Sequence, residues 1–203
     1  MPKVSEQHQE ARRRQLLAAA ARCIARRGFA ETSVREIYEE AGLSAGSVYV
    51  YFRSKDEIVE ALAHDVLARL TDRQELLERF DDPLEGVIAL VRALVSAASL
   101  APEGALALRV QAWGTAVTHP PIAGFFREGF EGMRGTLAAA LERGQGSGHV
   151  ESSVEADAVA RVVLGMLHGL VLQLVLGTGT GPEAYGEACI RMIERALRPG
   201  AAA

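Results

Sequence analysis

The sequence predicts an all-α protein in which a short three-helix module precedes a body of six helices. Three observations support this prediction. Nearly half (49%) of the 203 residues are apolar and only 5% are aromatic, and straight-chain helix formers are common. Apolar residues recur at helical spacing along most of the chain, and no segment is a convincing strand. Capping boxes, glycines and prolines mark the expected helix ends.

The first expected helix runs from Glu10 to Arg27. One face of it is apolar, at Leu16, Leu17, Ala20, Ala21 and Ile24. Arg26 and Arg27 lie in its last turn, where cations suit the helix dipole, and Gly28 follows as a left-handed cap. These two arginines are therefore better explained as helix-end residues than as ligands of an anion. Residues 12–14 are three arginines near the helix start, where cations oppose the dipole, so an external anion would help to account for them.

Short, closely spaced helices follow. The capping-box motif S-x-x-E occurs at residues 33–36 and again at 54–57. The first box opens a helix of little more than two turns that ends at Gly42, and the second opens a long helix to about residue 80. Residues 44–52 form another short segment between them. Short helices joined by turns of three or four residues, with a glycine in the middle turn, describe a helix-turn-helix module.

The rest of the chain is a series of helices separated by proline and glycine. These helices are expected at residues 83–100, 102–117, 122–143, 152–176 and 183–197. A third S-x-x-E motif, at residues 152–155, is expected to cap the fourth of them. The expected division is a helix-turn-helix domain at 1–55 and a second helical domain at 56–203.

Residues 42–46 match G-x-S-x-G, the nucleophile elbow of serine hydrolases, and so raise the question of an enzyme. An elbow needs a strand before the serine, yet the preceding segment has helical period and a capping box. A catalytic triad would also need an acidic residue and a histidine downstream on a β-sheet, and the sequence predicts no sheet. We therefore expect no enzyme, and we expect Ser44 to cap a short helix.

The short helix that Ser44 opens has an unusual outward face. Val48 and Phe52 are spaced to point inward, which leaves two tyrosines and a valine, among others, on the outside. Tyrosine hydroxyls that reach phosphates and a valine that meets a thymine methyl would explain them. Lys55 starts the next helix, where a cation opposes the dipole unless a phosphate lies above that helix end.

The stretch TSVREIYEEAGLSAGSVYVYFRSKDEIVEAL resembles the N-terminal module of the TetR/AcrR family of bacterial transcriptional repressors, and the match covers about residues 10–62. Shared features are the short helix ending in Ala-Gly, the serine cap, the Gly-Ser-Val-Tyr core and the Ser-Lys-Asp-Glu start of the next helix. The resemblance implies phosphate contacts at Ser33, Tyr49, Tyr51 and Lys55. It implies base-reading positions, on the helix that Ser44 caps, at Ala45, Gly46, Ser47 and Val50.

Two of these positions depart from the family pattern. Ala45 stands where a lysine is frequent, and Val50 where an aromatic or polar residue is common. Both changes remove hydrogen-bond donors, so the base code of the family does not transfer. Fewer hydrogen bonds and more apolar contact with thymine methyls are expected instead.

The resemblance implies that residues 1–55 are a DNA-binding domain. The body resembles the family in layout, which implies an effector-binding and dimerisation domain at 56–203 with a helical effector pocket. Polar and aromatic residues that would suit a small hydrophobic or amphipathic molecule are Arg109, Trp113, Phe126, Phe130 and His168. Each of them also fits a plain core position. The sequence indicates neither a cofactor nor a metal site, because its two cysteines stand far apart among apolar neighbours.

The helix at 157–176 is apolar nearly all round, so it needs cover on more than one side. A second subunit is the economical cover, with candidate contacts at Val171, Leu174, Tyr185, Met192 and Ile193. Its longest apolar run, 162–176, is interrupted by His168 and Gln173 and is expected to be too short and too polar to cross a bilayer. No membrane partner and a cytoplasmic location are therefore expected.

Charge also points to an anionic partner at the start of the chain. Residues 1–55 carry a net charge of +4 and residues 56–203 a net charge of −8. The expected function is a ligand-responsive homodimeric repressor that binds palindromic double-stranded operator DNA and is released by a small effector. The alternatives are a helical protein-interaction module without DNA binding and a serine hydrolase that uses Ser44.

Overall fold

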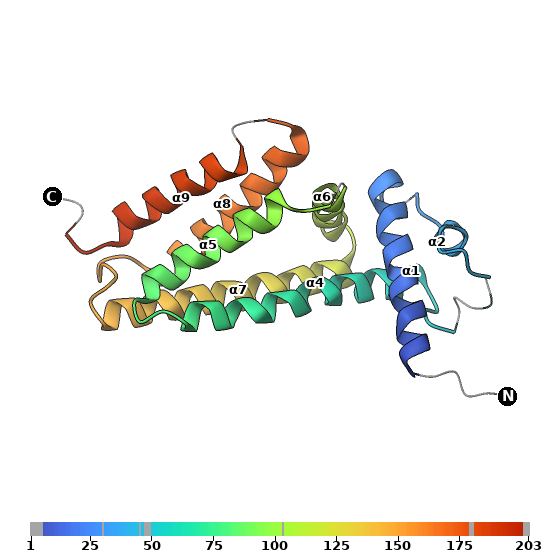
Figure 1. The fold of residues 1–203 in the computed structure, drawn as a ribbon, viewed down its shortest axis with the longest axis horizontal. Coiled ribbons are helices and arrows are strands. Elements are labelled where there is room, and N and C mark those ends of the chain that lie inside the picture. Colours follow the sequence, from blue (N-terminus) through green and yellow to red (C-terminus); the bar gives the residue numbers. More distant parts are fainter. Residues whose placement is uncertain are drawn as a thin grey trace. The chain divides into compact units, whose positions relative to one another are not determined.

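The structure is a computed structural model that describes residues 6–29, 31–44, 46, 50–102, 104–178 and 181–200, with the side chains at 6–7, 63–74 and 121 left aside. Every regular element in these ranges is a helix, which confirms the predicted all-α class (Figure 1). In chain order the helices are α1 (Glu6–Arg27), α2 (Val34–Glu40), α4 (Lys55–Glu78), α5 (Pro83–Ser99), α6 (Ala105–Ala116), α7 (Pro120–Gly146), α8 (Ala156–Leu176) and α9 (Pro182–Leu197).

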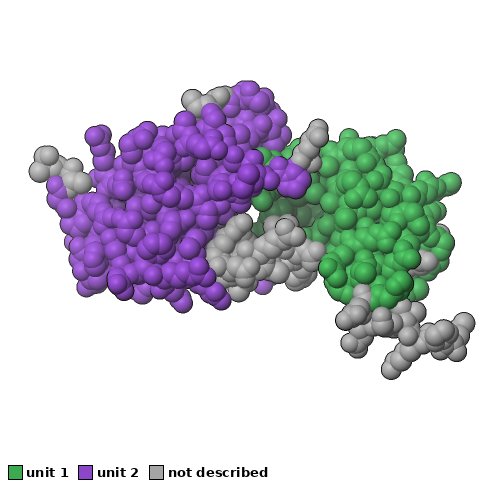
Figure 2. Space-filling view, viewed as in Figure 1, with its two compact units in different colours: residues 1–66, 103–126 green, residues 67–102, 127–203 purple. Residues whose placement is uncertain are grey.

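The chain folds into two compact units, coloured separately in Figure 2. The first unit contains residues 1–66 and 103–126, so α6 and the start of α7 pack with the N-terminal helices. The second unit contains residues 67–102 and 127–203. The packing units therefore follow a different division from the predicted functional boundary at 55/56, which stays a prediction.

The core of the first unit is built on the apolar face of α1. Leu16, Ile37, Phe52 and Ile58 are buried together with the alanines of α1. Burial of this kind stabilises a domain by about 1.5–3 kcal/mol for each large side chain. The expected apolar stripe of α1 is confirmed, since of its five members only Ala21 is not fully buried.

Helix ends in the first unit follow the local chemistry of the sequence. Gly28 has φ +86° and its N–H donates to the Ile24 carbonyl at 2.7 Å, which confirms the predicted left-handed cap of α1. Ser33 caps α2 and exchanges hydrogen bonds with Glu36 through both side chains and backbones, so the first predicted capping box is confirmed.

The other two predicted capping boxes differ from the structure. At the start of α4 the Glu57 N–H donates to Ser54 Oγ at 3.2 Å, but the Glu57 carboxylate accepts from the Arg53 N–H at 2.6 Å. The box is thus half formed and shifted by one residue. The box at 152–155 is wrong, because Glu155 itself is the N-cap of α8. A carboxylate near two backbone N–H groups serves the helix start as well as a serine does.

Helix α7 begins earlier than predicted, inside the chain break that the sequence led us to expect at residues 119–121. Pro120 is the first residue of α7, because a proline lacks only an N–H that the first turn does not use. At the other end α7 continues to Gly146, past the expected end at 143.

The second unit packs α5 against both α9 and α8. Two glycines of this unit allow very close approaches. A Cβ at Gly86 would lie 2.8 Å from the backbone oxygen of Leu77, and one at Gly186 would lie 3.0 Å from Val95. Arg198, just after α9, pairs with Asp82 and Glu85 at the start of α5.

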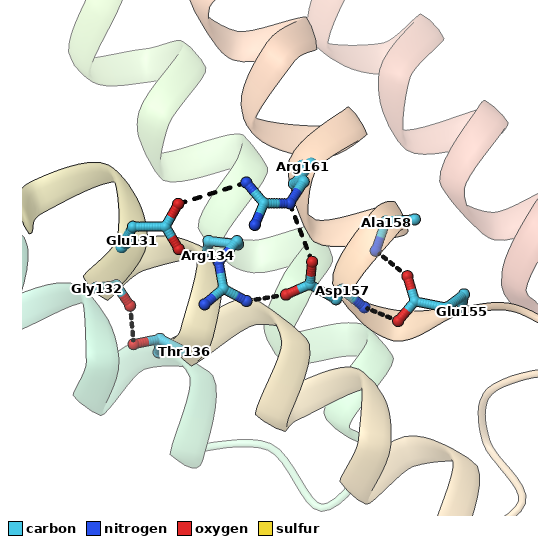
Figure 3. A network of polar contacts seen from close by, with 8 residues as sticks. All are labelled: Glu131, Gly132, Arg134, Thr136, Glu155, Asp157, Ala158 and Arg161. Carbon is cyan, nitrogen blue, oxygen red and sulfur yellow. Dashed lines mark hydrogen bonds and ion pairs between the residues drawn. The ribbon is translucent and has the colours of Figure 1, made fainter. Parts of the chain in front are cut away.

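A four-residue ion-pair network joins α7 to α8 (Figure 3). Arg134 pairs with Glu131 at 2.6 Å on its own helix and with Asp157 on α8. Arg161 pairs with Asp157 at 3.0 Å and reaches Glu131 at 3.4 Å. Each charge thus has two partners of opposite sign, which holds the start of α8 against α7. The hydrogen bonds from Arg134 and Arg161 keep the pKa of Glu131 below its ordinary value.

Helix α8 is 21 residues long and, by length and composition alone, is the one described helix that could cross a membrane. The apolar run 162–176, whose shortness argued against a membrane span, is the later part of this helix, which begins at Ala156. Its first turns carry the Asp157 and Arg161 ion pairs, and part of its length packs on α5 and α9. Val162, Leu172 and Leu176 are left exposed on it.

Candidate nucleic-acid interface

Helix α2 is fixed on α1 by arginine–glutamate pairs that cross between the two helices. Glu40 accepts from Arg26 at 2.7 Å and from Arg22 at 2.8 Å. These hydrogen bonds lower the pKa of Glu40, and the bond from Arg26 has the larger effect. Arg27 pairs with Glu36 in the same way. The arginines at the end of α1 therefore have protein partners, in agreement with their interpretation as helix-end residues.

Ser33 uses its hydroxyl within the protein. Its Oγ accepts from the Glu36 N–H at 3.2 Å and donates to Glu36 Oε2 at 3.0 Å. Hydrogen bonds from the Ser33 N–H and hydroxyl lower the pKa of Glu36 and keep it ionised. A phosphate contact at Ser33 would have to compete with this cap, although the side chain is exposed at the start of α2.

The segment between α2 and α4 carries the predicted base-reading positions. Ala45, Ser47 and Tyr49 lie outside the described residues, so their roles stay predictions. Ser44 and Gly46 are exposed, and the Val50 side chain is 77% exposed. Val50 is thus an apolar side chain presented to solvent in the segment between α2 and α4.

The residues that follow turn back into the core. Tyr51 is half-buried against the α1 core, while Phe52 is fully buried and lies under the guanidinium of Arg13 at 5.6 Å. This anchor fixes the end of the exposed segment. The sequence pattern did not reveal the Arg13 contact, because the two residues are 39 positions apart.

Lys55, predicted to bind a phosphate, is held by the end of α1. Its Nζ donates to the Phe29 carbonyl at 2.8 Å and lies 4.3 Å from the centre of the Phe29 ring. An ammonium has three donors, so the contact with Phe29 does not by itself exclude a phosphate. The structure adds a role that the sequence did not suggest: Lys55 ties the start of α4 to Phe29, just after the end of α1.

Three further contacts of the first unit were missed at the sequence level. Gln15 on α1 donates to the Ala41 carbonyl at 2.7 Å, which satisfies the end of α2. His119 lies with Nε2 3.3 Å from Asp56 on α4, and its ring meets Phe29 edge-on at 5.5 Å. No local signal marks such pairs, since each joins residues far apart in the chain.

Ser44 is preceded by helix α2 and the turn at Gly42, where φ is +64°. A nucleophile elbow requires a strand at this place. The described residues around Ser44 contain none, which removes the geometric basis of the hydrolase alternative.

The predicted effector residues fall in different parts of the fold. Phe130 and His168 stack in the second unit, with ring centres 5.7 Å apart and planes at 25°. Phe126 packs edge-on against Phe125. On α6, Arg109 is exposed and Trp113 is half-buried. The Phe130–His168 pair lies within the second unit.

The predicted dimer contacts need one correction. Val171 and Ile193 are 5% and 4% exposed, because they point into the core of their own unit, so they have little surface for a partner. Met192 is 59% exposed and Leu174 is half-buried. Tyr185 is half-buried and donates to the Met166 carbonyl at 2.7 Å. Leu172 and Leu176 are exposed apolar residues of α8 that the prediction did not include.

Comparison with known proteins identifies the kind of molecule. The family model described as "Bacterial regulatory proteins, tetR family" matches residues 16–62, and the model "BetI-type transcriptional repressor, C-terminal" matches residues 83–198. The HTH-type transcriptional repressor Rv1474c of Mycobacterium tuberculosis is 30% identical over 202 residues, which cover 98% of this chain and 99% of the relative. The HTH-type transcriptional repressor AcnR of Corynebacterium jeikeium is 27% identical over 201 residues, 98% of this chain and 100% of the relative.

A solved structure has the same fold over nearly the whole chain. It is a transcriptional regulator of Saccharomonospora viridis in complex with choline, with a TM-score of 0.81 and 24% sequence identity. The match covers 94% of this chain and 98% of that one.

Proposed function

This chain belongs to the tetR family of bacterial regulatory proteins, and we propose that it is a dimeric repressor that binds palindromic operator DNA and leaves it when an effector binds. Members of this family are non-enzymatic DNA-binding regulators. The observation that carries the DNA-binding part is the 77% exposed side chain of Val50, which precedes Tyr51 in the segment between α2 and α4. An exposed apolar residue in a basic N-terminal region fits contact with thymine methyls in a major groove.

Dimer formation is proposed from the exposed apolar surface of the last two helices. Val162, Leu172, Leu176 and Met192 are large apolar side chains left in solvent on α8 and α9. A second copy of the chain would cover them in a two-fold interface. Two DNA modules about one helical turn apart then read the halves of a palindrome.

The effector is proposed to be a small hydrophobic or amphipathic molecule, with choline-like quaternary ammonium compounds to be tested first. The BetI-type match of residues 83–198 and the choline complex of the Saccharomonospora viridis regulator support this choice. The stacked Phe130 and His168 offer aromatic faces of the kind that such cations prefer. A cytoplasmic location is part of the proposal, because operator DNA is found there.

The test is binding of the purified protein to a DNA fragment from upstream of its own gene. Fluorescence anisotropy should give an affinity that falls steeply with salt, with a slope of about −0.9 for each phosphate contact. Addition of the effector should weaken DNA binding, and operator DNA should weaken effector binding by the same factor. Salt-independent binding, or no binding to any such fragment, would favour the helical protein-interaction module instead.

A further inference from the structure

The three adjacent arginines of α1, at residues 12–14, differ in their partners. Because α1 begins more than a turn before them, the dipole at the helix start does not explain them. Arg12 donates to the neutral amide of a glutamine at 2.9 Å, and Arg14 pairs with the glutamate one turn before it at 3.7 Å. Arg13 makes no hydrogen bond or ion pair with any described residue, and its guanidinium lies over the Phe52 ring.

Arg53 is a second cation without a counter-charge. Its backbone N–H donates to the Glu57 carboxylate at 2.6 Å and the buried Phe52 precedes it, so its backbone is fixed on both sides. The side chain itself is exposed and forms no ion pair within the described ranges. Arg13 and Arg53 are therefore both anchored at Phe52, where the exposed segment that contains Val50 ends.

Other arginines of this region are neutralised within the protein. Those of α1 and α2 that pair with a glutamate are Arg14, Arg22, Arg26, Arg27 and Arg35. Residues 1–55 nevertheless carry a net charge of +4. In the part of the chain that the structure describes, this positive charge is left uncompensated at Phe52, by Arg13 and Arg53.

The arrangement of Arg13 suits a phosphate. A guanidinium carries its five N–H donors in one plane, so its face can rest on an aromatic ring while its edge binds two oxygens of a phosphate. Two cations held near one another without a counter-charge repel, and an anion between them reverses the sign of that interaction. Duplex DNA presents such anions at short and regular intervals.

We propose that Arg13 and Arg53 bind the phosphate backbone of operator DNA beside Phe52, in addition to the four phosphate contacts that the family resemblance implies. The inference rests on the proposed function, because it adds contacts with the same DNA. Phosphate contacts set the position of a protein on the duplex. Since Arg13 rests on Phe52, its contact fixes α1 and the end of the exposed segment on one DNA strand together.

The salt dependence of operator binding tests both residues. Each phosphate contact contributes about 0.9 to the slope of log affinity against log salt, so Arg13→Gln and Arg53→Gln should each make the slope shallower by about 2 for a dimer. At about 0.1 M salt each variant should bind about tenfold to hundredfold more weakly. Arg14→Gln is the matched control on the same helix and should keep the wild-type slope, because Arg14 already has a carboxylate partner.

The slope also separates phosphate binding from a structural role of Arg13. Loss of the Phe52 contact lowers the fraction of active protein by the same factor at every salt concentration, so it leaves the slope unchanged. Arg13→Lys keeps the charge and should restore the slope, although it loses the planar fork. Circular dichroism of each variant gives the folded fraction.

Operators with single neutral methylphosphonates identify the phosphate. At one position in each half-site the substitution should weaken wild-type binding about as much as Arg13→Gln does, and it should weaken the Arg13→Gln protein no further. Wild-type slopes in both glutamine variants, or equal sensitivity of wild type and Arg13→Gln at every methylphosphonate, would overturn the inference while the proposed function stands. Absence of operator binding by the wild-type protein would refute the proposed function and the inference together.

Discussion

Replacing Lys55 by methionine separates two contributions of one side chain. In the structure its ammonium donates to the Phe29 carbonyl at 2.8 Å and lies 4.3 Å from the ring centre. A hydrogen bond from a charged donor contributes about 1.5–3 kcal/mol, and a partly exposed cation–π contact about 0.5–1 kcal/mol. Methionine keeps the apolar stem. We therefore expect the free energy of unfolding to fall by about 2 kcal/mol and the melting temperature by about 4–8 °C.

The same variant tests the predicted phosphate contact. If Lys55 also neutralises one phosphate per subunit, the slope of log affinity against log salt becomes shallower by about 2 for a dimer. Urea unfolding and salt-dependent anisotropy on an operator fragment measure the two effects. Arg79→Met, just after α4 and in an exposed pair with Glu75, is the control for loss of a charge. Unchanged stability would refute the role of the Phe29 contact, and an unchanged slope would refute the phosphate contact.

Three further predictions concern packing, assembly and acid stability. Gly86→Ala should destabilise the protein by about 1–3 kcal/mol in urea, because its Cβ would lie 2.8 Å from a backbone oxygen, whereas Gly124→Ala, with open space around it, should not. Met192→Asp should give monomers in sedimentation velocity if the exposed α9 surface is the dimer interface; an unaltered dimer would exclude it. The pKa of Glu40 is lowered in the folded state, chiefly by Arg26, so the stability it contributes is present at neutral pH. That stability should be lost as the pH falls below about 4.5, and Glu40→Gln should flatten this part of the stability–pH curve.

Local signals in the sequence predicted much of the helical framework. The apolar face of α1, its Gly28 cap and the Ser33–Glu36 box each involve residues within one or two turns of each other, so periodicity and capping chemistry suffice. The start of α8 was placed wrongly because serine and glutamate can both accept from a helix N-terminus, and the sequence pattern does not decide between them.

Contacts between residues far apart in the chain could not be predicted from these local signals. Phe29 meets Lys55 and His119, and Gln111 meets Ala25, although these partners are 26 to 90 positions apart. Val171 and Ile193 were predicted at an interface because an apolar helix needs cover, but periodicity cannot tell whether that cover comes from the same chain or from a second copy. Their burial in the second unit decides for the same chain.

The grouping of residues 103–126 with the N-terminal unit has a consequence for exchanging parts between relatives. A fragment cut at residue 66 would lose α6, which packs on α1, together with the Gln111 bond to Ala25 and the His119 contact with Asp56. Such a fragment should be less stable than its own apolar core suggests. A chimera that joins this DNA-binding module to another regulator's body inherits a foreign α6. It should therefore need matched residues at positions 56, 111 and 119 for the two parts to pack stably. Recombination within the family is thus constrained at α6 as well as at the apparent domain boundary.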